Sequence, residues 1–209
     1  MHFERAFEDD ANVYMLLELC GTGHTLAHAV ASRGRLPERE AAAHLAAVLA
    51  ALRHLHARGV IHRDVKPANC LLRARCPATP LPEGAQSCMA LADLGLAARC
   101  ESDGRRHGVC GTPNYLAPEV LAGAAGGGHA HEADAWSAGA LAFTLLCGQA
   151  PFAAPTVDDT YARIRAADLR VPTHLSVRAP RAAAVPRTQA CDATAAVLPS
   201  DRFPSRAYR

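Results

Sequence analysis

The pattern of apolar and polar residues predicts two long helices in the middle of the chain. In Glu38–Ala57, apolar residues recur at steps of three and four positions, and Gly59 follows the last of them. This stripe consists of Leu45, Val48, Leu49, Leu52 and Leu55. It is typical of an amphipathic helix that packs one face against a core, and the glycine beyond it ends the helix. Asp134–Cys147 is apolar on nearly every side, which predicts a helix at the centre of a domain.

Shorter patterns predict the remaining elements. Runs of β-branched and aliphatic residues predict strands at Val13–Leu19, Val60–Ile61, Leu71–Leu72 and Met89–Ala92. Two shorter helices are expected at Thr25–Ser32 and Thr156–Ala167. Prolines and a glycine predict a loop at Arg73–Ser87. After Pro172 the chain is rich in proline, alanine and arginine, and we expect no regular structure there.

Composition narrows the classes of function. Over 209 residues the formal net charge is +2, so the charge balance favours neither nucleic acid nor a membrane surface as partner. The longest apolar run, Ala138–Cys147, is too short to span a bilayer. The eight cysteines form no C-x-x-C pair, which argues against a zinc site, and the first residues show no secretory signal pattern. We therefore expect an intracellular protein, in the cytoplasm or nucleus, with reduced cysteines.

The stretch "VIHRDVKPANCLL", Val60–Leu72, places three chemically different side chains close together. Lys66, the only lysine of the chain, lies two residues after Asp64 and three before Asn69. A phosphoryl-transfer site needs such groups: an acid for the proton of the attacking hydroxyl, a cation for the charge of the moving phosphate, and an amide oxygen for a metal ion. A structural turn does not need this spacing, so the three residues are candidate catalytic groups.

Three further motifs follow in sequence. They are "DLG" at Asp93–Gly95, "GTPNYLAPE" at Gly111–Glu119 and "DAWSAG" at Asp134–Gly139. Together with "HRDVKPAN" they resemble the eukaryotic protein kinase family, whose motifs H-R-D-x-K-x-x-N, D-F-G, A-P-E and D-x-W-S-x-G come in this order. The stretches "FEDDANVYMLLELC", "CGTPNYLAPEVL" and "TYARIRAADLRVPTHLS" are similar to the polo-like serine/threonine subfamily.

The resemblance implies an α+β protein-kinase-like fold, with a mainly α-helical large lobe and only the last strands of the small lobe. Residues 1–19 would be the remnant of the small lobe and the approach to the hinge, 20–172 the large lobe, and 173–209 a divergent, poorly ordered tail. No glycine-rich loop G-x-G-x-x-G precedes Val13, and since Lys66 is the only lysine, the phosphate-anchoring lysine of the small lobe is missing as well. ATP normally lies between two lobes, so we expect the chain by itself to transfer phosphate poorly.

The resemblance also implies roles for individual residues. Asp64 would be the catalytic base that orients the substrate hydroxyl, and Lys66 would neutralise the γ-phosphate during transfer. Asn69 and Asp93 would bind Mg²⁺, which bridges the phosphates of ATP. Thr112 would bond Asp64 and Lys66 and help to shape the substrate platform.

Further residues would support the site. Pro113 and Tyr115 would complete the substrate platform. The segment from Glu18 to Cys20 would be the hinge, whose backbone groups meet the edge of adenine, and Leu71 would lie under the adenine ring.

Structural roles are implied for His62, Asp134 and Trp136, because a buried aspartate in a central helix can hold the backbone amides of the catalytic loop. The remaining histidines carry no such role. His24 and His28 lie four residues apart without a third ligand nearby, so we do not expect them to bind a metal. Surface or packing roles are expected for His54, His56, His129 and His131.

Some positions depart from the family pattern. Gly108 occupies the place of the phosphorylatable threonine of polo-like kinases, which excludes switching by phosphorylation there. Leu94 replaces the phenylalanine of D-F-G and is expected to pack in the same pocket. Arg202, in a weak match to the end of kinase domains, is expected to pair with Glu119. Ala68 carries no negative charge, so it offers no ion-pair partner to a basic residue that precedes the phosphorylated serine or threonine of a substrate.

Two functions remain open from the sequence. The first is ATP- and Mg²⁺-dependent phosphorylation of protein serine or threonine residues, with acidic-directed substrates as polo-like kinases prefer. The alternative is a catalytically inactive kinase-lobe interaction module. Asp64, Asn69 and Asp93 favour the first, and the missing lysine and glycine-rich loop favour the second. The sequence leaves the oligomeric state open.

Overall fold

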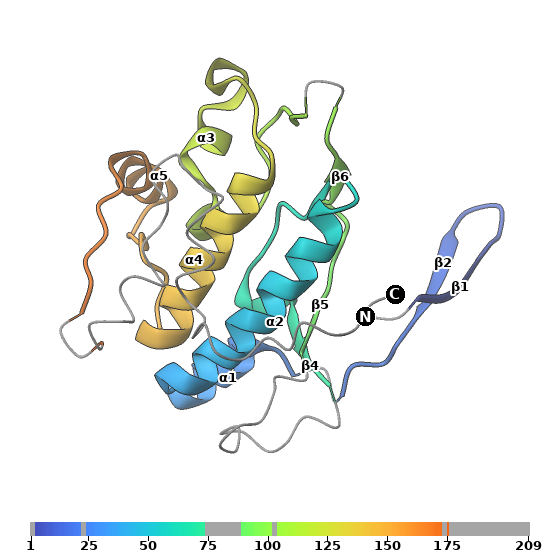
Figure 1. Ribbon diagram of the computed structural model, residues 1–209, viewed down its shortest axis with the longest axis horizontal. Helices are drawn as coiled ribbons and strands as arrows, with labels where there is room; N and C mark the ends of the chain where they lie inside the picture. Colours follow the sequence, from blue (N-terminus) through green and yellow to red (C-terminus); the bar gives the residue numbers. More distant parts are fainter. Residues whose placement is uncertain (1–2, 22–23, 74–88, 102–103, 173–174, 176–209) are drawn as a thin grey trace, which may run out of the picture.

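The computed structural model describes residues 3–21, 24–73, 89–101, 104–172 and 175 (Figure 1). Its helices are α1 Leu26–Arg33, α2 Glu38–His56, α3 Pro118–Leu121, α4 His131–Cys147 and α5 Val157–Ala166. Its strands are β1 Phe3–Glu8, β2 Val13–Leu17, β3 Val60–Ile61, β4 Cys70–Leu72, β5 Met89–Leu91 and β6 Ala98–Arg99. Short 3-10 turns are η1 Pro67–Asn69, η2 Pro113–Tyr115 and η3 Gly123–Gly126. The described strands pair antiparallel as β1–β2, β3–β6 and β4–β5.

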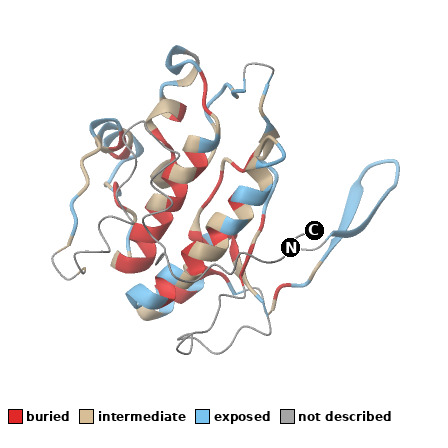
Figure 2. Ribbon diagram, viewed as in Figure 1, coloured by how far each residue is buried: buried red, intermediate tan, exposed pale blue. Residues whose placement is uncertain are grey.

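Helix α4 runs through the middle of the helical body, beside α2 and between it and α5 (Figure 1). Most of its residues are buried, as its continuous apolar pattern predicted, whereas α2 buries a single stripe (Figure 2). That stripe contains Leu45, Val48 and Leu52, while Leu49 and Leu55 at its border are half-buried. The two helices therefore pack through the faces that their sequence periods predicted.

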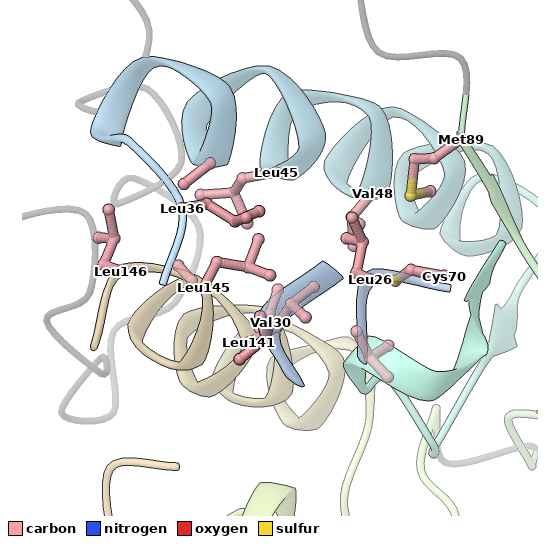
Figure 3. Close-up of a cluster of buried hydrophobic side chains, with 14 of the residues drawn as sticks. Leu26, Val30, Leu36, Leu45, Val48, Cys70, Met89, Leu141, Leu145 and Leu146 are labelled. Atoms are coloured by element: carbon pink, nitrogen blue, oxygen red, sulfur yellow. The ribbon is translucent and has the colours of Figure 1, made fainter. Parts of the chain in front are cut away.

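Two apolar clusters form the core. The larger lies between α1, α2, α4 and the β4–β5 pair, and includes Leu26, Val48, Cys70, Leu141 and Leu145 (Figure 3). The smaller joins α3, α4 and α5, where Trp136 stacks on Phe152 with ring centroids 5.6 Å apart. This burial confirms the structural role expected for Trp136.

The β1–β2 hairpin projects away from the helical body, and all its strand residues are exposed (Figures 1 and 2). The turn between the strands is closed by Asp9, whose carboxylate accepts hydrogen bonds from the backbone amides of Ala11 and Asn12 over 2.9 and 2.8 Å. An aspartate side chain that bonds the backbone two residues on is a common way to stabilise a tight turn.

Several element predictions need correction. The strand predicted at Val13–Leu19 ends at Leu17, and the helix predicted from Asp134 begins three residues earlier, at His131. Strands β1 and β6 were not predicted, because neither has a long apolar run and both depend on pairing with another segment. The other predicted helices and strands lie within one or two residues of their expected ends.

Two segments predicted from the sequence lie almost wholly outside the described residues. The loop predicted at Arg73–Ser87 lies outside them apart from Arg73, and so does the tail apart from Leu175. Among the helices that are described, none combines the length and the apolar character that crossing a bilayer requires.

Candidate active site

The loop between β3 and β4 carries three of the four predicted catalytic residues. Strand β3 pairs with β6 and strand β4 with β5, so both ends of the loop are held by short antiparallel pairs. Within the loop, Val65 and Pro67 are buried, and the turn η1 brings Asn69 back toward Asp64. The apolar residues of the motif thus anchor the loop, while its polar residues stand together above the core.

Asp64 is 6% exposed and forms the centre of a hydrogen-bonded group. Its carboxylate accepts bonds from Lys66 Nζ over 2.7 Å, Thr112 Oγ1 over 2.7 Å and Asn69 Nδ2 over 3.0 Å. Lys66 Nζ also donates to Thr112 Oγ1 over 2.8 Å, and Asn69 Nδ2 donates to the backbone oxygen of Asp64 over 2.8 Å. The structure therefore brings all four predicted catalytic residues together, with Thr112 bonded to Asp64 and Lys66 as expected.

The partners of Asp64 determine its charge. Burial raises the pKa of the Asp64 carboxyl, because a charge removed from water loses hydration. The hydrogen bonds from Lys66 and Thr112, the charge of Lys66 and the hydrogen bond from Asn69 outweigh burial, so the pKa lies below its ordinary 3.8. Asp64 is thus ionised at neutral pH and can accept a hydrogen bond from a substrate hydroxyl.

Thr112 reaches Asp64 because the chain before it passes very close to the catalytic loop. Gly111 has a φ of +120°, and a Cβ atom there would lie 2.7 Å from the backbone oxygen of Arg63. The segment after Thr112 is tied to α4 by Ser137 Oγ, which donates to the backbone oxygen of Tyr115 over 2.8 Å. These contacts place η2, the predicted substrate platform, beside the catalytic loop.

Asp134 holds the catalytic loop from below. Asp134 is fully buried in the first turn of α4. Its carboxylate accepts hydrogen bonds from the backbone N–H groups of His62 and Arg63, each over 2.8 Å. His62 is buried; its Nε2 donates to Ala92 O over 3.2 Å, and its Nδ1 accepts from the Asp64 amide over 3.3 Å. The structural roles expected for Asp134 and His62 are therefore confirmed.

Two residues of the site have a left-handed backbone. Arg63 and Asp93 have φ values of 67° and 63°, a region that residues other than glycine seldom occupy. Arg63 is held by Asp134 and by its own Nε, which donates to Leu96 O over 2.7 Å. Backbone strain of this kind persists where surrounding contacts enforce it, and it clusters at functional sites.

Asn69 and Asp93 are the predicted magnesium ligands. A backbone hydrogen bond ties their segments together, because Ala92 N, next to Asp93, donates to Asn69 O over 2.8 Å. Asn69 uses its amide nitrogen for Asp64, and its amide oxygen takes part in neither bond. Asp93 is exposed, with Oδ1 accepting from Gly95 N over 3.2 Å. A carboxylate and an amide oxygen are hard donors of the kind that Mg²⁺ prefers, so the residues present fit this ion.

The described residues do not form a full protein cage for a metal. Within the described ranges, no three His, Cys, Asp or Glu side chains converge to hold a metal ion. Mg²⁺ bound with one or two protein oxygens takes its other ligands from substrate phosphates and water. The arrangement of Asn69 and Asp93 therefore suits a metal that arrives with a phosphate ligand.

Three of the predicted nucleotide-binding residues, Glu18, Cys20 and Leu71, have contacts of other kinds. Glu18 follows β2 and forms an ion pair with Arg73, with Glu18 Oε1 3.0 Å from Arg73 Nε. Cys20 is buried, and Leu71 in β4 forms an isolated bridge with Thr25 before α1. These three residues are not members of the hydrogen-bonded group around Asp64, and their contact with adenine stays a prediction.

One expectation for the segment after Asp93 is wrong. Leu94 is 54% exposed and does not fill a buried pocket. Arg202 lies outside the described residues, so its pairing with Glu119 stays a prediction. Glu119 itself is half-buried, and burial raises the pKa of its carboxyl. Gly108 is exposed in the segment that precedes Thr112.

His56 makes contacts beyond the surface or packing role expected for it. Its Nε2 lies 2.8 Å from Asp134 Oδ2, and its ring stacks on that of His131 with centroids 4.3 Å apart. The expected surface or packing roles do fit His54, which is exposed, and His129, which is buried. Only the position of His56 in the last turn of a helix leading to "HRD" could have signalled its contact with Asp134.

Comparison with known proteins places these observations in a family. The protein kinase domain family matches residues 1–203. The chain is 43% identical over 178 residues to the probable serine/threonine-protein kinase CCRP1 of Zea mays, covering 85% of this chain and 26% of that protein. It is 39% identical over 175 residues to the inactive serine/threonine-protein kinase PLK5 of Mus musculus, covering 83% and 27%.

A third relative is the serine/threonine-protein kinase polo of Drosophila melanogaster, 36% identical over 174 residues, with 83% of this chain and 28% of that protein covered. The chain thus spans about a quarter of the length of the curated relatives it matches. The motif order, the group around Asp64 and the family match agree with one another. The chain therefore belongs to the protein kinase domain family, in which it is similar to the polo-like serine/threonine kinases.

Proposed function

We propose that the chain carries the catalytic loop of an ATP-dependent protein serine/threonine kinase. The observation that supports this most directly is the shared bonding of Lys66 Nζ to Asp64 and Thr112. A structural ion pair needs no hydroxyl placed between the two charges. A phosphoryl-transfer site benefits from one, because it fixes the base and the cation in one geometry before substrate binds.

Each residue has a defined task in this proposal. Asp64 orients the substrate hydroxyl and accepts its proton, and Lys66 offsets negative charge on the phosphate in transfer. Thr112 holds both side chains and starts the η2 platform on which the substrate backbone lies. Asn69 and Asp93 hold Mg²⁺, which when bound neutralises charge on the phosphates.

The proposed substrates are proteins with acidic residues near the phosphorylated serine or threonine. Ala68 supports this, since it is exposed in η1 beside the catalytic loop and offers no carboxylate to a basic residue. The similarity to polo-like kinases supports it as well. A peptide series in which acidic residues are replaced singly by alanine measures the preference.

A second function has its own support. One relative bears the name of an inactive kinase, PLK5 of Mus musculus, at 39% identity. This favours an interaction module that keeps the kinase fold without catalysis. Against it stands the complete group around Asp64, because a module without chemistry has no need for an ionised carboxylate bonded to three donors.

Two measurements on the 209-residue chain separate these functions. The first is the melting temperature in excess Mg-ATP, because a ligand present at a hundredfold its Kd stabilises the folded state by about 2.7 kcal/mol. The second is transfer of labelled phosphate to casein by the wild type, Asp64→Asn and Asp158→Asn. Asp158 is an exposed aspartate of α5 and serves as the matched control.

The kinase proposal predicts stabilisation by Mg-ATP, and slow transfer that Asp64→Asn abolishes and Asp158→Asn leaves unchanged. No stabilisation and no transfer would favour the interaction module. Transfer that persists in Asp64→Asn would show that the phosphate comes from a contaminating kinase.

A further inference from the structure

A cavity of about 390 Å³ is lined by the end of α4, by the segment that joins α4 to α5, and by α5 with the residues after it. Its apolar lining comes from Phe143 and from the alanines and prolines of residues 150–155. Its polar lining consists of Gln149, Arg163, Asp168 and Arg170. None of the predicted catalytic, metal or nucleotide-binding residues lines this cavity, so it is separate from the group around Asp64.

The walls of the cavity are held in place by the core and by one arginine. Phe152, in the segment that joins α4 to α5, is fully buried in the smaller apolar cluster. The guanidinium of Arg163 donates to the backbone oxygens of Ala153 and Pro151 over 2.7 and 3.4 Å. It also donates to the backbone oxygen of Asp168 over 3.2 Å, which joins the two sides of the cavity. The cavity is therefore formed before a ligand arrives, as is usual for binding sites.

Arg170 supplies the donors that a ligand can use. Its side chain is 84% exposed, and its Nε lies 3.9 Å from Asp168 Oδ2, which is beyond hydrogen-bonding distance. Arg163, by contrast, directs its Nε to the same carboxylate oxygen over 3.3 Å. Within the described residues the guanidinium of Arg170 forms no hydrogen bond. It can therefore bind both oxygens of an incoming carboxylate through two parallel N–H groups.

The charges of the lining favour an anion. Two arginines and one aspartate line the cavity, which leaves one positive charge in excess. The aspartate is compensated by Arg163, so the excess charge belongs to Arg170. Helix α5 also carries Asp158 and Asp159 in its first turn, but neither of them lines the cavity. A negatively charged group is therefore attracted to the side of the cavity where Arg170 lies.

We propose that this cavity binds an acidic segment of a protein, with one glutamate or aspartate carboxylate on Arg170 and the neighbouring residues against the alanines and prolines. The proposal deepens the proposed function by naming a second place that holds an acidic substrate. It rests on that function in taking the segment to belong to a substrate. Helix α5 contacts both α3 and η2, the predicted substrate platform, so one helix joins the two binding regions.

The lining suits a carboxylate better than a phosphate or a nucleic acid. A carboxylate carries one negative charge, which matches the single guanidinium with free donors. A phosphorylated side chain carries nearly two negative charges, and the second would lie close to Asp168 without a cation of its own. Single-stranded nucleic acid is bound by several basic residues together with exposed aromatic rings. The one aromatic residue of the lining, Phe143, is buried.

Binding of an acidic peptide to the full 209-residue chain tests the proposal without ATP. The probe is a short fluorescein-labelled peptide with glutamates among alanines and prolines, and without serine, threonine or tyrosine. The comparison peptide has glutamine in place of every glutamate. By fluorescence anisotropy we expect the glutamate peptide to bind about tenfold more tightly, and its affinity to fall as salt is added. No binding, or equal affinity for the two peptides, would overturn the proposal.

Three variants assign the binding to Arg170. Arg170→Glu removes the free donors and reverses the charge, so affinity should fall by about tenfold or more. Arg165→Glu makes the same change at an exposed position of α5 outside the cavity, and should stay within about twofold of the wild type. Asp168→Asn removes the carboxylate that competes for Arg170 and should tighten binding by a few fold. Both arginines are exposed, so their variants should fold.

Equal losses in Arg165→Glu and Arg170→Glu would mean that the peptide responds to overall charge, and weaker binding by Asp168→Asn would contradict the competition for Arg170. In the wild type, amide resonances of Ala153 and Arg170 should shift when the glutamate peptide is added. Shifts confined to the catalytic loop would place the peptide elsewhere and overturn the proposal. Peptide binding needs no phosphate transfer. A failed kinase proposal therefore leaves binding intact, whereas a failed docking proposal shows no specific binding.

Discussion

The hydroxyl of Thr112 donates a 2.7 Å hydrogen bond to the carboxylate of Asp64, although 48 residues separate them in the chain. The same hydroxyl accepts a hydrogen bond from Lys66 over 2.8 Å. Thr112 thus connects the segment of the substrate platform to the base and to the cation of the proposed reaction. The bond makes the position of Asp64 depend on how the segment before η2 is folded.

Removing this hydroxyl should slow phosphate transfer with little effect on folding. Thr112→Val keeps the shape of the side chain but loses both bonds, and we expect transfer to fall on the order of tenfold to a hundredfold. Thr112→Ser keeps the hydroxyl and should stay within a few fold of the wild type. Initial rates of labelled phosphate transfer measure this. Equal rates for the two variants would show that Thr112 does not orient Asp64.

Replacing Asp134 should destabilise the protein strongly. An asparagine at this buried position would place an N–H group against the amides of His62 and Arg63, both of which need an acceptor. We expect Asp134→Asn to lower the free energy of unfolding by about 2–3 kcal/mol. Urea denaturation at neutral pH measures the change, and the exposed Asp158→Asn is the control. A loss no larger than that of the control would mean that the loop is held by other contacts.

The contribution of Asp64 to stability should depend on pH. Because its pKa is lower in the folded protein than the ordinary 3.8, the ionised form favours the folded state. This contribution is complete above pH 3.8 and is lost as the pH falls through the lowered value. The difference in unfolding free energy between wild type and Asp64→Asn should therefore shrink below pH 3.8. Denaturant titrations across this range test the sign, and a difference that grows toward acid contradicts it.

Replacement by alanine should change the stability of the protein in opposite directions at two glycines, one inside α4 and one at its C-terminal end. Gly148 ends the helix with a φ of +81°, and a Cβ atom there would overlap the backbone oxygen of Gly34. Gly148→Ala should cost at least about 1–3 kcal/mol, because both the backbone and the contact are unfavourable. Gly139, inside the helix, has nothing within 4 Å of such an atom. Gly139→Ala should therefore be neutral or stabilise by up to about 1 kcal/mol. Thermal unfolding compares the pair, and equal losses would contradict the close approach at Gly34.

Much of the fold was predictable where the signal is local. The apolar stripe of α2 and the continuous apolar pattern of α4 are periods that a helix must display to be buried on one side or on all sides. The N-terminal ends of α1 and α5 are capped by Thr25 and Thr156, whose hydroxyls accept amides three residues on. Such caps act within one turn and can be seen in the sequence.

Elements that depend on a partner were harder to predict. Strand β6 has two residues and exists only through pairing with β3, in which Ile61 lies opposite Ala98, 37 residues further along the chain. No run in the sequence marks it. Strand β1 carries charged residues at Glu4 and Arg5 between its aromatic ones, and the pairing with β2 defines it. Pairing across the chain is not encoded in the composition of a single strand.

The sequence by itself determined the identity and order of the catalytic groups. Asp64, Lys66 and Asn69 lie within one short loop, so their spacing already brings them together. Only the tertiary structure decided that Asp134 and His56 meet beneath that loop. His56 precedes Asp134 by 78 residues, and its contact exists because α2 packs along α4. A local period fixes which face of a helix is buried, whereas the meeting of two side chains from different helices depends on the register in which the helices pack.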